Sequence, residues 1–198
     1  MLEETGVPYE AHLVRFEAKD QLSPEFTSLN PYGKIPAIID PRGPNGRPMP
    51  LFESGAILMY LAEKTGRFLP KDPPRRYETI AWLFFQVGGV GPMFGQVGYF
   101  HKFEGRKYED KRPRDHYVDE ARRLLRVIDR RLEERNWMMG DEYTIADIAI
   151  FPMVRNLVGY YNAGALVGIE DFPNVTRRLE AFLARPAVAK GLVNPPSV

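Results

Sequence analysis

Cysteine is absent from this sequence of 198 residues, and histidine is scarce. Without cysteine the chain can form no disulfide, no thiolate metal site and no cysteine nucleophile, and no thiol indicates its redox compartment. The three histidines, His12, His101 and His116, show no paired spacing. We therefore expect no metal site, zinc included.

The sequence also lacks an excess of positive or negative charge. The sequence has 27 Lys and Arg against 26 Asp and Glu, a net charge of +1, so we expect neither nucleic acid nor a membrane surface as a partner. No apolar run reaches membrane-spanning length, and no signal peptide opens the sequence. Hydrophobic residues make up 44% and charged residues 27%, which is typical of a globular protein with one large or two small domains.

Residues 35–66 have the pattern strand, hairpin, strand, helix. Residues 35–39 are a short apolar run rich in β-branched residues, and a second strand restarts at residues 51–52. The loop between them is dense in turn formers and includes Asn45-Gly46, a strong hairpin signal. A helix is expected next. One of its faces would carry Ala56, Ile57, Tyr60 and Leu61, and Gly66 would end it.

Two features of this stretch suggest a binding site. Pro36 within a strand removes a ladder hydrogen bond, so it belongs at an edge, a bulge or a cis turn. A cis bond would leave the backbone of Ile35 free to pair with an extended peptide. Ser54 is expected to cap the next helix, whose N-terminus attracts a carboxylate, and Glu53 could hold an ammonium group beside it. For either feature alone, an edge proline or a plain helix cap is the simpler interpretation, but the two together, a hairpin apart, make a binding site an equal alternative.

The motif Asn-Pro-x-Gly-Lys-Ile-Pro-Ala-Ile at residues 30–38 is followed by Leu-Phe-Glu-Ser-Gly-Ala-Ile-Leu-x-Tyr-Leu-Ala-Glu-Lys at residues 51–64. Together they resemble the glutathione-binding half of cytosolic glutathione transferases. The subgroup they resemble most is the bacterial nu class, which is related to fungal nitrogen-regulator/prion proteins. The resemblance continues through residues 82–96 and 143–149 and covers essentially the whole chain.

The resemblance implies an α/β thioredoxin-like domain over residues 1–70 and an all-α helical domain over residues 71–198. Family members open with a β-strand, a loop that carries the catalytic hydroxyl or amide residue, and a full first helix. This sequence begins within that helix, so we expect the first strand to be missing and assign no catalytic residue. A misassigned start, a deliberate truncation and a genuinely shortened protein all remain open as explanations.

Other segments are predicted from periodicity and capping signals. Gly88 to Pro92 is expected to kink the first long helix of the second domain. Thr144 and Asp147 form a variant capping box at the start of a buried helix, so we interpret Asp147 as structural. The tail from Asn194 is expected to be loose. The remaining expected elements are a helix that ends at Gly6, a strand over 10–16, a helical turn opened by Ser23-Pro24, and helices over 75–96, 114–135 and 174–185.

The resemblance also implies a glutathione site. The γ-Glu end would lie on Glu53 and Ser54, and the cysteine backbone would pair with Ile35. Related proteins contact the glycine end near Gln21 and Lys34, although both could be ordinary exposed polar residues. In nu-class relatives, an arginine matching Arg123 reaches across a dimer, although a solvated helix face carrying Arg122 and Arg123 is an equal alternative. The complete set of expected glutathione contacts is Gln21, Lys34, Ile35, Pro36, Glu53, Ser54 and Arg123.

A group of side chains near the expected kink could line a cleft between the two domains. Aromatic residues near a kink more often belong to a core, and we favour that interpretation. The residues in question are Gln86, Phe94, Gln96, Tyr99 and His101.

The implied function is a cytoplasmic, homodimeric glutathione transferase with glutathione as co-substrate. It would conjugate a small electrophile or reduce a disulfide. One alternative is a non-catalytic binding or regulatory protein of the same fold, as the fungal regulators illustrate. A weaker alternative is a folding-deficient fragment of a longer gene product.

Overall fold

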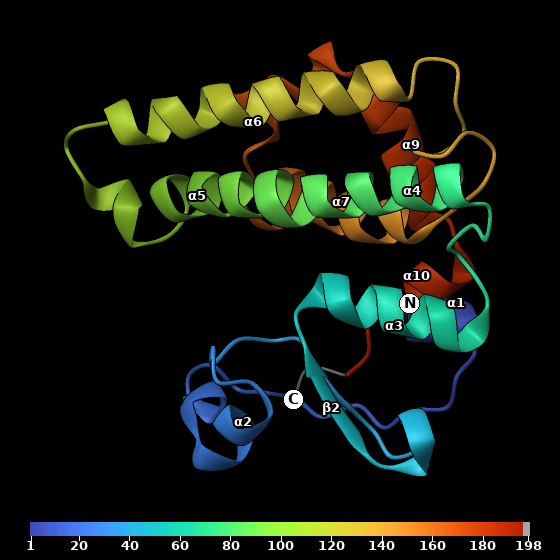
Figure 1. Ribbon diagram of the computed structural model, residues 1–198. Helices are drawn as coiled ribbons and strands as arrows, with labels where there is room; N and C mark the ends of the chain where they lie inside the picture. The colour runs from blue at the N-terminus through green and yellow to red at the C-terminus, as the bar shows by residue number, and fades with distance from the viewer. Residues whose placement is uncertain (196–198) are drawn as a thin grey trace.

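The structure is a computed structural model that describes residues 1–195. Figure 1 shows two lobes, a smaller one that holds the sheet and the N-terminus and a larger one built of helices. The tail predicted to be loose falls mostly on residues 196–198, which lie outside the described residues.

The expected α/β and all-helical parts are both present. The boundary predicted at residue 70 falls in the segment that connects α3 to α4, and it stays a prediction. The smaller lobe contains α1 (Leu2–Thr5), η1 (Asp20–Leu22), α2 (Pro24–Leu29), β1 (Ala37–Asp40), η2 (Pro44–Gly46), β2 (Met49–Phe52) and α3 (Ser54–Thr65). The rest of the described chain contains α4 (Pro73–Phe85), η3 (Gln86–Val90), α5 (Gly91–His101), η4 (Glu104–Lys107), α6 (Arg112–Arg131), α7 (Ile145–Arg155), η5 (Asn156–Tyr160), α8 (Gly164–Val167), η6 (Ile169–Asp171), α9 (Pro173–Leu183) and α10 (Pro186–Gly191).

The predicted hairpin is confirmed. β1 and β2 pair antiparallel, with Ala37 opposite Phe52. Asn45 and Gly46, in the loop between them, have left-handed φ angles of 61° and 70°. The strand begins one residue after Pro36, not around it, because proline has no N–H to give to the ladder.

The strand predicted over residues 10–16 is wrong. These residues have no regular secondary structure, and Leu13 and Phe16 are 43% and 52% exposed. Their alternating pattern suits a strand, but a strand needs a neighbour to accept its backbone hydrogen bonds. In residues 1–195 the sheet contains β1 and β2 alone, and neither of them pairs with this segment.

The C-terminal end of α3 was predicted correctly, but its N-terminal cap was not. Gly66 ends the helix with a left-handed φ of 66°, as predicted. Ser54, however, is the first helical residue and not the cap. Glu53 occupies the cap position at φ 69° and ψ 118°, because its carbonyl accepts the first helical bond, from Ile57 N at 2.9 Å.

The buried face of α3 only partly matches the predicted one, of which Ile57 and Leu61 are buried. Leu58 and Ala62 are buried, whereas Ala56 is exposed and Tyr60 is half-buried. Leu58 and Ala62 pack in a cluster that includes residues of α4 and α7. Because α3 lies between the sheet and the helical lobe, its own periodicity could not show which side would be covered more completely.

A polar contact fastens α3 to β1. Tyr60 and Lys64 both donate hydrogen bonds to the Asp40 carboxylate. These two donors, Lys64 first, lower the pKa of Asp40 to about 2. The carboxylate therefore remains charged at any pH near neutrality, and the contact persists.

The long helix of the larger lobe is interrupted where the glycines predicted a kink. Residues 86–90 form a π-helical segment, η3, between α4 and α5. Phe84 of α4 is 63% exposed, and Tyr77 is 70% exposed on the same side, two turns earlier.

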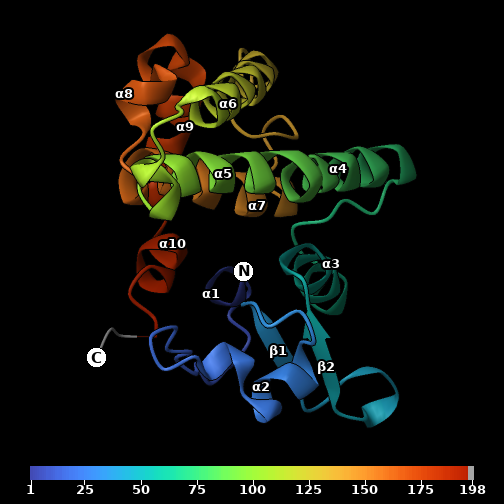
Figure 2. The ribbon, with the colours of Figure 1, turned by 90° about the vertical axis from the view of Figure 1, so that its left-hand side faces the viewer.

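α4, η3 and α5 together run over 29 residues from Pro73 to His101, which are long and apolar enough to cross a membrane by length and composition alone. The expectation that no segment reaches that length is therefore wrong. The same test is passed by core helices, and Val90 and Phe94 of this segment are fully buried in the larger lobe. Figure 2 shows α4 and α5 between α6 on one side and the smaller lobe on the other.

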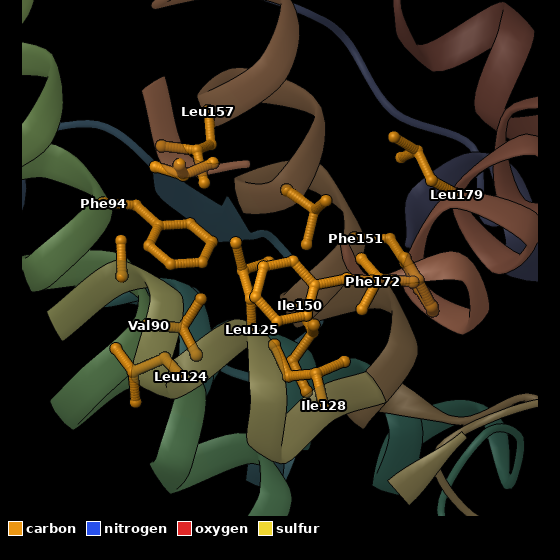
Figure 3. Close-up of a cluster of buried hydrophobic side chains, with 14 of the residues drawn as sticks. Val90, Phe94, Leu124, Leu125, Ile128, Ile150, Phe151, Leu157, Phe172 and Leu179 are labelled. Atoms are coloured by element: carbon orange, nitrogen blue, oxygen red, sulfur yellow. The ribbon is translucent and has the colours of Figure 1, made fainter. Parts of the chain in front are cut away.

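The core of the larger lobe forms where α5, α6, α7 and α9 meet (Figure 3). Leu125 and Ile128 of α6 are fully buried. α7 is apolar nearly all round, which is typical of a helix that packs on several sides. Ile150 and Phe151 belong to this core, whereas Ile145 and Ile148 pack against α3.

The predicted capping box at the start of α7 is confirmed. The Asp147 carboxylate, fully buried, accepts hydrogen bonds from Met138 N at 2.8 Å, Thr144 N at 2.9 Å and Thr144 Oγ1 at 3.2 Å. Burial raises the pKa of Asp147 to about 6, against these donors, which lower it. The helix start is bonded to the smaller lobe as well, because Ile145 N donates to Phe68 O at 2.9 Å.

A second tie between chain segments lies beside this helix start. Arg185 donates to both carboxylate oxygens of Glu4, at 2.6 and 2.8 Å, and so joins α1 to the start of α10. Its guanidinium also lies 3.7 Å from the centre of the Tyr143 ring. Burial has the largest single effect on the pKa of Glu4 and raises it, but the hydrogen bond and charge of Arg185, together with the N-terminal ammonium and Tyr143, outweigh burial and lower the pKa.

Replacing Asp147 by asparagine tests the structural role of this carboxylate. An amide NH₂ would face backbone donors, so we expect the free energy of unfolding to fall by about 2–3 kcal/mol. Urea unfolding followed by circular dichroism measures the change. Asp119→Asn, at an exposed position of α6, is the control and should change stability by less than about 0.5 kcal/mol. Equal effects for the two variants would contradict the assigned role.

Candidate functional site

A tight turn connects α2 to the residues that precede β1. Asn30 ends α2, and its side chain accepts from Tyr32 N at 2.9 Å and donates to Lys34 O at 2.6 Å. Gly33 has a φ of 65° and donates its N–H to Asn30 O at 3.0 Å. A Cβ on Gly33 would lie 3.3 Å from the Gln21 carbonyl oxygen, so this turn favours glycine on both counts.

A cleft of about 170 Å³ lies between this turn and the start of α3. It brings most of the predicted glutathione contacts together, although they come from two segments separated by the hairpin. Its lining consists of Asn30, Tyr32, Lys34, Ile35, Pro36, Glu53 and Ser54.

One end of the cleft is the N-terminus of α3. The first N–H groups of a helix have no partner within the helix, and no side chain caps them here. Together with the Ser54 hydroxyl they can receive a carboxylate, which the helix dipole also favours. The exposed Glu53 adds an anion that can hold an ammonium group.

The middle of the cleft is formed by Ile35 and Pro36, which are joined by a cis peptide bond, as the sequence suggested. Ile35 precedes the strand and its N–H and C=O make no backbone hydrogen bond, so both groups could pair with an extended peptide.

The other end of the cleft carries Lys34. Its ammonium lies 4.3 Å from the centre of the Tyr32 ring and donates a hydrogen bond to the Tyr32 hydroxyl at 2.9 Å. The cleft therefore has a cation on one side, an anion on another and an open helix N-terminus. This combination of charges suits a short peptide with two carboxylates and one ammonium.

Two predicted contacts lie outside the cleft. The Gln21 backbone carbonyl lies beside Gly33 in the turn, and the Gln21 side-chain oxygen is buried without a hydrogen-bond partner. Arg123 is on α6, where it binds Glu120 at 2.9 Å. In Figures 1 and 2 α6 lies beyond α4 and α5 as seen from the smaller lobe, and Arg123 does not line the cleft of its own chain. Arg122 bonds to Val167 O and Asp171, which gives it a structural role.

The residues considered for a cleft between the domains are mostly engaged elsewhere. Phe94 is fully buried, as the core interpretation favoured, and Gln86 is 7% exposed. His101 shares a hydrogen bond with Asn162 O at 3.2 Å, and Tyr99 with the Tyr108 hydroxyl at 3.1 Å. None of them lines the cleft beside α3.

Sequence reasoning missed Asn30 and Tyr32. A signal for Asn30 was present, since Asn-Pro-x-Gly favours a turn closed by the asparagine side chain. Tyr32 had no such signal, because its place over Lys34 depends on the turn geometry. Within residues 1–195 no cluster of three His, Asp or Glu side chains is arranged to hold a metal.

Comparisons with known families match both parts of the chain. Residues 1–63 match the family described as "Glutathione S-transferase, N-terminal domain", and residues 91–186 match "Glutathione S-transferase, C-terminal domain". The cleft lies within the first matched region.

Individual proteins are also similar in sequence to this chain. The disulfide-bond oxidoreductase YghU of Escherichia coli is 41% identical over 191 residues, which cover 96% of this chain and 65% of YghU. This chain thus spans just under two thirds of that relative.

Solved structures are closer still. A glutathione transferase from Burkholderia graminis, crystallised with two glutathione molecules per subunit, has 66% identity and a TM-score of 0.98, covering 100% of this chain and 82% of that one. A Pseudomonas putida glutathione transferase with one bound glutathione disulfide has 64% identity and a TM-score of 0.96, covering 98% and 84%. The chain therefore belongs to the glutathione transferase family.

Proposed function

We propose that this protein binds glutathione in the cleft beside α3 and uses it to reduce disulfides or to conjugate small electrophiles. One observation carries the proposal. A single cleft collects the accessible backbone of Ile35, the open helix N-terminus at Ser54, and the opposite charges of Lys34 and Glu53.

Glutathione, γ-Glu-Cys-Gly, has groups that match this arrangement. Its γ-Glu carboxylate would lie on Ser54 and the N-terminus of α3, and its ammonium beside Glu53. The cysteine backbone would pair with Ile35 in the manner of an added strand. The glycine carboxylate would then face Lys34, the cation of the cleft.

Disulfide reduction is the favoured reaction, because the E. coli relative is named a disulfide-bond oxidoreductase and the Pseudomonas putida protein binds glutathione disulfide. Two glutathione molecules would reduce one disulfide to two thiols and leave as glutathione disulfide. Both this reaction and conjugation need the thiolate, and a thiol like that of cysteine has a pKa near ~8.5. Each pKa unit of lowering needs about 1.4 kcal/mol of preferential thiolate stabilisation.

A homodimer and a cytoplasmic location complete the proposal. The exposed Tyr77 and Phe84 lie on one side of α4 and offer an apolar surface for a second copy. A second copy could also bring an arginine such as Arg123 to the cleft, which its own chain does not do. The cytoplasm suits the function because its glutathione pool is reducing.

Replacing Glu53 by glutamine tests the binding mode. The variant keeps the shape of the side chain but loses the charge that would hold the ammonium, so we expect binding to weaken roughly tenfold to a hundredfold, since a hydrogen bond to a charged group contributes about 1.5–3 kcal/mol. Calorimetry with glutathione measures it, and Glu109→Gln, at another exposed glutamate, should bind like the unaltered protein. Unchanged affinity in Glu53→Gln, or no binding by the unaltered protein, would refute the proposed site.

Turnover separates an enzyme from a binding protein. With glutathione and hydroxyethyl disulfide we expect a rate above the protein-free reaction, and a kcat/KM for glutathione that falls at least about tenfold in Glu53→Gln, because substrate and transition state share the same anchoring. An aryl halide tests conjugation in parallel. Tight glutathione binding without turnover of either compound would instead favour the non-catalytic alternative.

The oligomeric state tests the apolar surface of α4. Sedimentation velocity should give about twice the chain mass for the unaltered protein, and Phe84→Ser should shift it toward the monomer at micromolar concentration, since removing a buried aromatic side chain costs about 3–5 kcal/mol. Phe16→Ser, at an exposed phenylalanine of the N-terminal coil, is the control and should leave the mass unchanged. A monomeric unaltered protein would refute the dimer.

A further inference from the structure

We propose that Asn30, although it lines the cleft, is a positioning residue that acts on a bound peptide through Lys34, because its own polar groups are already bonded within the turn and α2. The inference rests on the proposed function, because it assigns a role within the same glutathione site. Neither the cleft chemistry nor the charge pattern requires an asparagine at this place, so the role has to come from the turn.

Asn30 uses every polar group that it has toward this turn and α2. Its backbone N–H donates to Phe26 O at 2.9 Å and its backbone C=O accepts from Gly33 N at 3.0 Å. Its side-chain carbonyl accepts from Tyr32 N at 2.9 Å, and its amide donates to Lys34 O at 2.6 Å. The residue is only 2% exposed, so solvent cannot replace these bonds at low cost.

The bonding pattern requires an amide. Rotating the side chain by half a turn would set its NH₂ against the Tyr32 N–H and its oxygen against the Lys34 carbonyl. Aspartate could accept from Tyr32 N but could not donate to Lys34 O, and serine is too short to bridge both groups. Asparagine alone among these three satisfies both ends of the turn.

Closing the turn determines where Lys34 points. Because one side chain holds the backbones of residues 32 and 34, with the left-handed Gly33 between them, the two side chains lie next to each other. The Lys34 ammonium rests on the Tyr32 ring and hydroxyl, at 4.3 Å and 2.9 Å. A lysine side chain is otherwise flexible, and holding it in place before the ligand arrives improves affinity by reducing the ordering cost of binding.

The effect should be local to one end of the cleft. Glu53 and Ser54 are carried by α3, which is packed on α7 and joined to β1 independently of the Asn30 turn. Loss of the Asn30 amide should therefore affect the recognition of the glycine carboxylate and leave the recognition of the γ-Glu end intact.

The test compares two peptides, glutathione and γ-glutamylcysteine, which lacks glycine and therefore places its carboxylate elsewhere. Calorimetry measures both affinities for the unaltered chain, Asn30→Asp, Asn30→Ser and Lys34→Gln. Asn30→Asp removes the donor and adds a charge, whereas Asn30→Ser removes the donor without adding one. Circular dichroism verifies folding, and if one Asn30 variant does not fold, the other carries the test.

We expect the preference for glutathione over γ-glutamylcysteine, about tenfold in the unaltered chain, to fall to about threefold or less in the Asn30 variants. Affinity for γ-glutamylcysteine should change less than about twofold. In a Lys34→Gln background, adding Asn30→Ser should have no further effect, because the two residues act as a unit.

Equal weakening of both peptides, or an effect of Asn30→Ser that adds fully to that of Lys34→Gln, would overturn the positioning role while leaving the proposed function intact. An unaltered chain that binds neither peptide would overturn the proposed function, and the inference with it.

Discussion

The buried carboxylate of Asp147 holds the start of α7, and the two lobes of the protein meet on that helix. Three donors converge on the carboxylate, from Met138 and Thr144, and they fix both the loop before the helix and its first turn. The next residue after Thr144, Ile145, donates its N–H to Phe68 in the smaller lobe. One polar contact therefore sets the direction of a helix that is apolar nearly all round and has cores on two sides.

The position of one wall of the cleft depends on this arrangement indirectly, through α3. α3 packs its Leu58 and Ala62 against the side of α7 that faces the smaller lobe, and its tie to Asp40 fastens it to β1. The position of the α3 N-terminus, where Glu53 and Ser54 lie, follows from these contacts. The opposite wall of the cleft is set separately, by the Asn30 turn. A peptide bound between them would therefore sense two independently built walls, which suits a site that must read both ends of a small zwitterionic molecule.

Local signals in the sequence predicted the local structure well. Gly66 ends α3 with a positive φ, Asn45-Gly46 closes the hairpin, the glycines after residue 88 interrupt the long helix, and Thr144 with Asp147 forms the capping box. Each of these depends on a few neighbouring residues, so spacing alone reveals it. The charged and polar groups of the cleft were recognised for the same reason, because they occur in two short motifs.

The sequence by itself determined the hairpin, the C-terminal end of α3 and the capping box of α7, since these follow from backbone conformation within a few residues. The residue types that line the cleft were evident from two short motifs. Only the tertiary structure decided which sides of the elements are covered. It left residues 10–16 without a partner strand and exposed Phe84. Strand pairing and burial are contacts between segments distant in the chain, and an amphipathic pattern shows that a face exists without showing what, if anything, lies against it.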